Sequence, residues 1–336
     1  MNTDTRLQQL TEWVHQDWPT ATIEVASADA SFRRYFRVSN IDATENGTTY
    51  IAMDAPPEQE DCTPFIDVTT RLRNAVVHAP EIIKQDLEQG FLLLEDFGNT
   101  PYLDKLNDTT ADLLYGDALK CLIKIQQADT DGLPEYDDAL LLQEMQLMPE
   151  WFLNTHLEIT PSDEQQKIIN RTLHSITAVV LQQPQVFVHR DYHSRNLMIT
   201  ENANPGVIDY QDAVLGPVTY DLVSLLRDCY IKWPIEKVSE WALAFKKDAV
   251  AAGLIHDVSD ETFSQWFDYM GMQRHIKVLG IFARLNHRDG KANYLNDLPL
   301  TLEYFMNVAN KYPMTRPLAN LFTEWQTPEK IGTAKK

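Results

Sequence analysis

The chain has little positive charge, and it lacks long apolar segments. Its 336 residues include 29 basic and 49 acidic ones, so the formal net charge is -20. A surface of this sign repels nucleic acids and anionic membranes. No apolar run approaches the ~18 residues of a membrane helix, and the polar N-terminus has no signal-peptide core. These absences predict a cytoplasmic protein that binds neither nucleic acid nor membrane, and no feature of the sequence indicates an obligate protein partner.

Cysteines and glycine-rich phosphate motifs are also scarce. The three cysteines, Cys62, Cys121 and Cys229, are far apart and form no C-x-x-C pair, which predicts reduced thiols rather than disulfides or a zinc site. The phosphate loop G-x-x-x-x-G-K-[ST] does not occur anywhere, and G-x-G-x-x-G is absent from the first hundred residues. If the chain binds a nucleotide, other residues must hold its phosphates.

The most informative feature that is present reads H-R-D-x-x-x-x-N at residues 189–196, followed by an apolar pair and Asp209. Kinase-like phosphotransferases use this spacing for a proton acceptor and two magnesium ligands. We therefore expect Asp191 to accept a proton from an attacking hydroxyl. Asn196 and Asp209 would supply the amide and carboxylate oxygens that Mg²⁺ prefers. His189 is expected to brace the loop rather than to react.

Two other interpretations of this segment stay open at this point. His189, Asp191 and His193 alternate as H-x-D-x-H, a pattern compatible with zinc or iron in a metal-dependent hydrolase. That interpretation leaves Asn196 and Asp209 without a role. The segment is also compatible with a buried polar turn that takes no part in chemistry.

The pattern of apolar residues changes near residue 100. Before it, runs rich in β-branched and aromatic residues predict strands at 22–26, 33–38, 49–53 and 91–95. A helix is predicted where four residues fall on one stripe: Phe65, Val68, Leu72 and Val76. The segment 96–101 breaks the pattern and is a candidate hinge.

Beyond the hinge the chain becomes mostly helical. Apolar stripes predict helices over residues 114–125, 169–180 and 222–230. Three short apolar runs, at 186–188, 197–199 and 206–209, predict short strands on either side of the H-R-D loop.

The loop with its extra His193, and the apolar-apolar-Asp that follows it, resemble the aminoglycoside phosphotransferase and choline kinase superfamily, a small-molecule branch of the protein kinase-like fold. The resemblance covers most of the chain. It implies an α+β, bilobal fold, with a small β-rich N-terminal lobe over residues 1–97 and a larger, mostly helical C-terminal lobe over 98–336. It also implies ATP and Mg²⁺ as cofactors. Because Asp209-Tyr210-Gln211 replaces D-F-G and no A-P-E follows, a protein kinase is not indicated.

Within this resemblance, residues 31–38 match the hairpin that covers the phosphates, and residues 91–96 match the strand and hinge that seat adenine. The resemblance therefore implies that the backbone near Glu95 and Phe97 holds the adenine ring.

The expected phosphate-anchoring lysine is missing. Met53 stands at its position, and the first lysine of the chain is Lys84. The available substitutes are the hairpin residues Arg33, Arg34 and Arg37, since a guanidinium group clamps phosphate oxygens through paired donors. Solvated surface arginines are the alternative interpretation, and a catalytically inactive nucleotide-binding regulator would also explain a missing lysine.

Four further segments, 54–57, 90–98, 216–222 and 282–291, are together similar to one bacterial subfamily of anomeric kinases for N-acetylmuramate and N-acetylglucosamine in peptidoglycan recycling. This similarity implies ATP-dependent phosphorylation of the C1 hydroxyl of an amino sugar, the small-molecule partner of the chain. The candidate sugar-binding residues are Glu144, Trp151, Arg284, Asn286 and Arg288. An arginine of this set would meet the lactyl carboxylate of N-acetylmuramate.

Alternatives stay open for the substrate as well. For each candidate residue, a surface salt bridge or a core aromatic is the other possible role. For the acceptor, the alternatives are another small alcohol, namely an aminoglycoside, choline or a different sugar.

Overall fold

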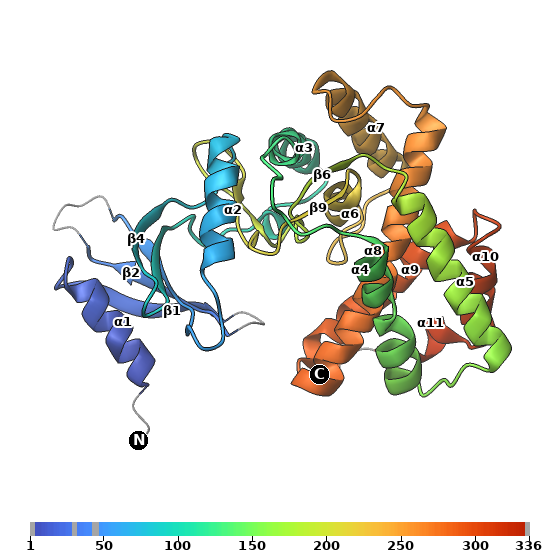
Figure 1. Ribbon diagram of the computed structural model, residues 1–336, viewed down its shortest axis with the longest axis horizontal. Helices are drawn as coiled ribbons and strands as arrows, with labels where there is room; N and C mark the ends of the chain where they lie inside the picture. The colour runs from blue at the N-terminus through green and yellow to red at the C-terminus, as the bar shows by residue number, and fades with distance from the viewer. Residues whose placement is uncertain (1–3, 29–31, 42–46, 333–336) are drawn as a thin grey trace. The chain divides into compact units, whose positions relative to one another are not determined.

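The computed structural model describes residues 4–28, 32–41 and 47–332 (Figure 1). The chain divides into two compact units. The first unit comprises residues 1–102 together with 196–212, and the second comprises 103–195 and 213–336. The segment 196–212, which the sequence assigned to the C-terminal lobe, thus packs with the first unit. The division into functional lobes at residues 97 and 98 stays a prediction.

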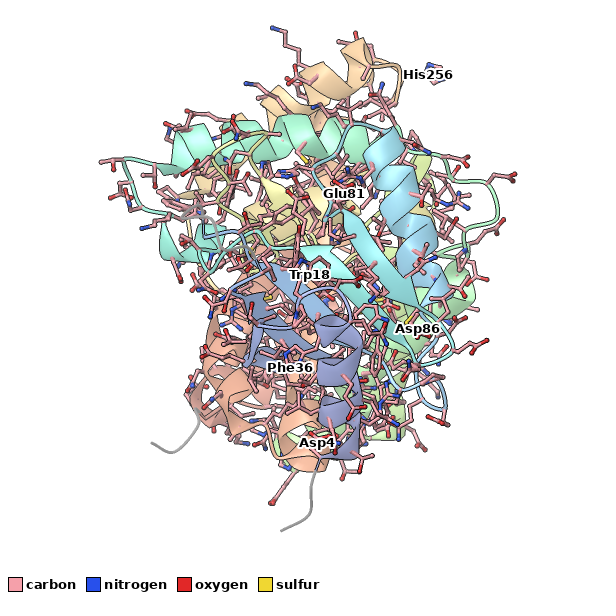
Figure 2. All side chains as sticks on the ribbon, turned by 90° about the vertical axis from the view of Figure 1, so that its left-hand side faces the viewer. Asp4, Trp18, Phe36, Glu81, Asp86 and His256 are labelled. Carbon is pink, nitrogen blue, oxygen red and sulfur yellow. The ribbon has the colours of Figure 1, made fainter. Side chains whose placement is uncertain are left out.

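The first unit is built on an antiparallel sheet with strand order β1-β2-β3-β5-β4. The strands are β1 (Thr22–Ala28), β2 (Arg34–Ser39), β3 (Tyr50–Asp54), β4 (Ile82–Asp86) and β5 (Phe91–Glu95). Helix α1 (Thr5–His15) packs its buried Trp13 and Val14 against one face of the sheet. Phe36 and Trp18, labelled in Figure 2, belong to the same apolar cluster. Apolar burial between helix and sheet holds this unit together.

Four of these strands were predicted from the sequence, and β4 was not. Only alternate residues of β4 are partly buried, and they include Lys84, so this edge strand carries a weak apolar signal. The predicted helix is α2 (Thr63–Asn74), where Phe65, Val68 and Leu72 are buried. The prediction for Val76 was wrong: the helix ends before it, its φ is 59°, and it is 73% exposed.

The first unit also contains the hairpin of β7 (Leu197–Met198) and β8 (Gly206–Val207), which pair antiparallel. In the second unit, β6 (Gln185–Val188) pairs with β9 (Val214–Pro217). These elements confirm the three short strands predicted around the H-R-D loop.

The second unit is mostly helical. Its elements are α3 (Ala111–Gln126), α4 (Asp138–Met145), the π-helix η2 (Met148–His156), α5 (Asp163–Val180), α6 (Tyr220–Leu226), α7 (Ile235–Ala251), α8 (Asp260–Asp289), the 3-10 helix η3 (Ala292–Asp297), α9 (Leu298–Ala309), α10 (Arg316–Glu324) and α11 (Thr327–Lys330). A 3-10 turn, η1 (Tyr102–Asp104), lies where the two units meet in the sequence. The 30-residue α8 is central: it packs against η2, α5 and α9, and Figure 1 shows α5 and α9 beside it. The predicted α+β class is therefore confirmed.

The predicted helices over 114–125 and 169–180 are α3 and α5, and their apolar stripes are buried. The third predicted helix is shorter than expected, because α6 ends at Leu226. Asp228 accepts hydrogen bonds from the backbone N–H groups of Ser194 and Tyr230, so the chain turns there and Cys229 lies outside a helix. All three cysteines are free and buried. Within the described ranges, no helix combines the length and apolar character that spanning a membrane requires.

Candidate active site

The H-R-D loop follows β6 in the second unit and is held by a buried carboxylate. Asp221, near the start of α6, accepts hydrogen bonds from the backbone N–H of His189 at 2.7 Å and of Arg190 at 3.0 Å. Arg190 has a φ of 76°, which side-chain-bearing residues rarely adopt. Burial raises the pKa of Asp221 to about 7, although the two backbone donors act in the opposite direction. The loop conformation therefore depends on Asp221.

Asp191 is surrounded by positive charge from α8. Burial acts to raise the pKa of Asp191, but His193, Lys277 and Arg274 together hold it below its ordinary value. The two α8 cations lie more than eighty residues from Asp191, so no spacing rule could have found them. Their signal in the sequence is weak: two cations within the helix segment 266–283, which is otherwise mainly apolar.

The two histidines of the H-x-D-x-H pattern have structural partners. The fully buried His189 accepts a hydrogen bond from the backbone N–H of Asp191 at its Nδ1, at 3.2 Å, and thus braces the loop as predicted. The ring of His193 meets that of Tyr230 edge to face, 5.4 Å between centroids. Among the residues that the structure describes, no three His, Cys, Asp or Glu side chains are grouped to hold a metal ion. The hydrolase interpretation gains no geometric support.

Asn196 and Asp209, the two predicted magnesium ligands, lie next to each other in the first unit. The β7–β8 hairpin brings them together, and Asn196 Nδ2 donates to Asp209 Oδ2 at 3.0 Å. Gln211 Nε2 donates to the other carboxylate oxygen at 3.0 Å. This arrangement places an amide group beside a carboxylate, and these are residue types that fit Mg²⁺.

Two of the three hairpin arginines are tied to carboxylates that organise the first unit. Arg34 binds Asp54, which is fully buried, at 2.5 Å, and it also pairs with Asp4. Arg37 binds both oxygens of Asp96, at 2.5 and 3.0 Å, and so connects β2 with the hinge. Neither is the solvated arginine of the alternative interpretation.

Arg33 has different surroundings. Its Nη2 lies 3.0 Å from Glu60 Oε2, in the turn before α2, and Glu60 Oε1 accepts a hydrogen bond from the backbone N–H of Phe32 at 3.2 Å. Burial acts to lower the pKa of Arg33, but Tyr35, Glu60 and Asp212 outweigh it and raise the pKa. Arg33 thus lies in the electrostatic field of Asp212, three residues after Asp209. The sequence contained no signal for Glu60.

The hinge side chains are packed within the first unit. Glu95 Oε2 accepts a hydrogen bond from the backbone N–H of Glu81 at 3.2 Å. The Phe97 ring contacts His78, 4.4 Å between centroids. It also covers Gly206 in β8 so closely that a Cβ there would lie 2.5 Å from the ring. The backbone of this segment is held firmly, which suits a rigid seat for a planar ring.

The five predicted sugar-binding residues all belong to the second unit, but they do not form one cluster. Glu144 is buried, where Arg190 Nη2 at 2.5 Å, Lys277 Nζ at 2.9 Å and the Tyr136 hydroxyl bind it. Trp151 is partly buried in η2.

The other three candidates lie near the C-terminus of α8. Arg284 and Arg288 are four residues apart and share a helix face. Asn286, two residues from each, lies on another face, so helix geometry does not bring the three together. Arg288 is exposed and pairs with Asp289 at 2.7 Å.

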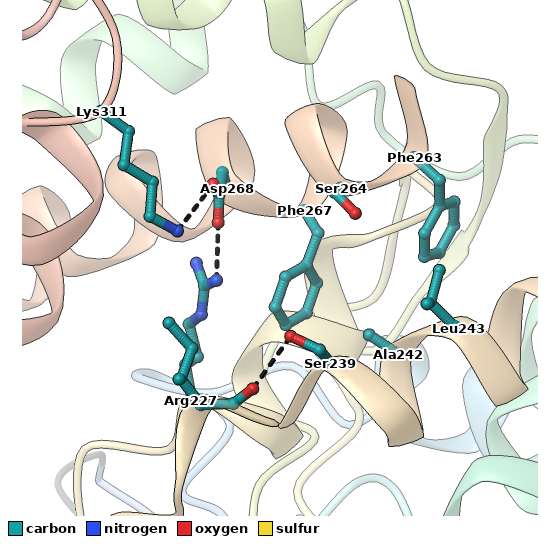
Figure 3. A pocket seen from close by; sticks show the side chains of 10 residues that line it. Arg227, Ser239, Ala242, Leu243, Phe263, Ser264, Phe267, Asp268 and Lys311 are labelled. Carbon is teal, nitrogen blue, oxygen red and sulfur yellow. Dashed lines mark hydrogen bonds and ion pairs between the residues drawn. The ribbon is translucent and has the colours of Figure 1, made fainter. Parts of the chain in front are cut away.

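A cavity of about 230 Å³ lies elsewhere, among α7, α8 and the chain after α6. Figure 3 shows Asp268 there, bound by Arg227 at 2.6 Å and by Lys311 at 3.4 Å. Phe263 and Phe267 form its apolar wall. None of the site residues predicted from the sequence lines this cavity.

Known proteins similar to the chain agree with the motif. The model of the "Phosphotransferase enzyme family" matches residues 22–254. The N-acetylmuramate/N-acetylglucosamine kinase of Pseudomonas putida is 44% identical over 336 residues, covering 96% of this chain and 97% of the relative. The protein of the same name from Neisseria meningitidis is 38% identical over 332 residues, covering 97% of both.

Two solved structures share the fold at low sequence identity. An ADP-bound aminoglycoside phosphotransferase superimposes with a TM-score of 0.59 at 14% identity, covering 88% of this chain and 98% of the other. An ethanolamine kinase of Plasmodium vivax superimposes with a TM-score of 0.62 at 10% identity, covering 89% of this chain and 84% of the other. These likenesses show a shared fold, and at such identities they carry nothing further.

The Glu144 cluster generates a stability prediction. Replacing Lys277 by Met leaves a buried carboxylate with one cation fewer, and we expect a loss of roughly 3 kcal/mol in the free energy of unfolding. The double variant, Lys277→Met with Glu144→Gln, should lose less free energy of unfolding than the two single variants together, by about 1 kcal/mol or more. Urea titrations measure these values. Lys237→Met, which breaks an exposed pair with Asp112, is the control and should leave the free energy of unfolding nearly unchanged. If the losses of the two single variants simply add up in the double variant, Lys277 and Glu144 are not energetically coupled.

Proposed function

The chain belongs to the phosphotransferase enzyme family, and from this we propose that it transfers the γ-phosphate of ATP to the C1 hydroxyl of an amino sugar, N-acetylmuramate, N-acetylglucosamine or both. The observation that carries the proposal is the identity of 38% to 45% that the chain shares, over at least 96% of its length, with three kinases named for these two sugars. Release of such sugars from the cell wall makes peptidoglycan recycling the proposed setting.

In the proposed reaction, Asp191 accepts the proton of the C1 hydroxyl while the hydroxyl oxygen attacks the γ-phosphorus of ATP. The new O–P bond forms as the bond between the γ-phosphorus and the bridging oxygen breaks, and ADP leaves. The lowered pKa of Asp191 keeps the carboxylate ionised at neutral pH. Asp221 holds the loop backbone, so the carboxylate needs no reorganisation before it takes the proton.

Asn196 and Asp209 are proposed to hold Mg²⁺, which neutralises charge on the phosphates of ATP when bound. Gln211 supports this role, since its hydrogen bond orients the Asp209 carboxylate. The backbone near Glu95 and Phe97 is proposed to hold the adenine ring.

Among the hairpin arginines, Arg33 is the proposed contact for the ATP phosphates in place of the missing lysine. Its pair with Glu60 resembles the way kinases orient a phosphate-binding cation with a carboxylate. Arg34 and Arg37, which pair with Asp54 and Asp96, are proposed instead to brace the hairpin and the hinge.

A panel of acceptors tests the proposed reaction. Purified protein with ATP and Mg²⁺ should release ADP with N-acetylmuramate or N-acetylglucosamine, and much more slowly with choline or an aminoglycoside. Phosphorus and proton NMR of the product should place the phosphate on C1. A phosphate at any other position, or turnover only with choline or an aminoglycoside, would refute the anomeric assignment.

Replacing Asp191 by Asn should lower kcat about 100- to 10,000-fold, the contribution expected from a general base. ATP binding, measured by calorimetry, should persist. Because neighbouring cations lower the pKa of Asp191, this carboxylate becomes protonated only at acidic pH. The wild-type rate should therefore fall on the acidic side of the pH profile. Unchanged turnover of the variant would remove Asp191 from the mechanism.

Replacing Arg33 by Gln should raise the KM for ATP about 10- to 100-fold, as expected for the loss of a hydrogen bond to a charged group. The KM for the sugar should stay within about twofold. Arg34→Gln is the comparison, because it removes the same charge from the same strand region but should lower stability instead. Equal effects of both variants on the KM for ATP would exclude a special role for Arg33.

A further inference from the structure

Four cations lie along one face of α8. Arg274, Lys277, Arg284 and Arg288 follow alternating steps of three and four residues, with Ile281 completing the series. This spacing keeps side chains on one side of a helix. On a chain with a net charge of -20, such an alignment creates a local field that attracts anions.

This row of cations begins beside the proposed catalytic base and ends at the surface. Arg274 and Lys277 are among the groups that lower the pKa of Asp191. They are 5% and 8% exposed, whereas Arg284 is partly exposed and Arg288 is fully on the surface. Seven residues separate Lys277 from Arg284, a rise of about 10 Å along the helix. Arg284 thus lies two helical turns beyond Lys277, toward the exposed end of this face.

Arg284 and Arg274 differ from the other two cations, because neither makes a hydrogen bond or an ion pair within the described residues. Lys277 binds Glu144, and Arg288 binds Asp289. Within the described residues, Arg284 makes no hydrogen bond and no close ion pair, and its Nε is buried without an acceptor. Asp289 lies within electrostatic reach of Arg284 but its oxygens are taken by Arg288. Arg274 is buried, whereas Arg284 is partly exposed, so of these two cations Arg284 is the one that an anionic ligand can reach.

An aromatic residue lies at the same level of α8. Glu144 contacts Lys277, a Cβ on Gly280 would touch Leu147, and His156 meets His287. The segment 144–156 therefore runs along α8 in the same direction.

Trp151 lies midway in that segment, at about the level of Arg284. It is partly exposed. An aromatic face beside a cation suits a sugar ring that carries an acid group.

We propose that Arg284 binds the carboxylate of an acidic amino sugar and thereby sets the preference between N-acetylmuramate and N-acetylglucosamine. The two sugars differ by a lactyl ether, which gives only N-acetylmuramate a carboxylate. A guanidinium pairs with a carboxylate through two parallel hydrogen bonds. This inference rests on the proposed function and adds to it the residue that recognises the acid group.

The test compares Arg284→Gln with the wild type on both sugars. We expect kcat/KM for N-acetylmuramate to fall about 10- to 100-fold, as for the loss of a charged hydrogen bond, and kcat/KM for N-acetylglucosamine to change less than about twofold. Arg284→Lys, which keeps the charge but not the paired donors, should recover part of the loss. Arg171→Gln, at an exposed position of α5, makes the same change of charge and should leave kcat/KM for both sugars unaffected.

Calorimetric binding of each sugar gives a readout that does not depend on turnover. Selective loss of N-acetylmuramate binding in Arg284→Gln supports the inference, even if phosphorylation occurs at a position other than C1. Suppose that the wild type phosphorylates both sugars. If the variant then loses activity on both sugars equally, or loses activity on neither, the inference is overturned and the proposed function stands. If the wild type phosphorylates N-acetylglucosamine but neither binds nor phosphorylates N-acetylmuramate, only the inference is overturned. Turnover of neither sugar overturns both.

Discussion

The rest of the site depends on two hydrogen bonds, which the backbone N–H groups of His189 and Arg190 donate to the Asp221 carboxylate. They hold Arg190 at a positive φ, and the Arg190 side chain then reaches Glu144 in α4. Glu144 in turn binds Lys277 in α8, which helps to keep Asp191 ionised. A carboxylate, a strained loop and two helices are thus linked by buried polar contacts, each of which is expensive to break.

Fold and substrate are specified by different parts of the molecule. Proteins with 10% to 15% identity share the fold while their names indicate different acceptors, an aminoglycoside or ethanolamine. The fold alone therefore does not specify the acceptor. In this chain we propose that α8 contributes to the surface that meets the acceptor: its middle is a core helix, and its C-terminal part carries Arg284 and Arg288.

Much of the fold was predictable because burial leaves a periodic trace. The sheet strands and helices α3 and α5 have apolar faces that the sequence displays directly. The edge strand β4 and the polar helix α1 bury too few side chains to show such a trace. The errors at Val76 and Cys229 have a common cause: an apolar residue continued the helical period after local hydrogen bonds had already ended the helix. Family membership, predicted from the loop and its flanking Asp, is confirmed.

The sequence by itself determined the reaction class, because Asp191, Asn196 and Asp209, the proposed base and metal ligands, stand at the spacing that is typical of kinase-like phosphotransferases. It also determined the broad α+β architecture. Only the tertiary structure distinguished Arg33 from Arg34 and Arg37, since the difference lies in carboxylates from distant segments. Likewise, only folding placed Arg274 and Lys277 near Asp191 and left Arg284 without a partner. Charges interact through space, so their partners follow from packing and not from their order along the chain.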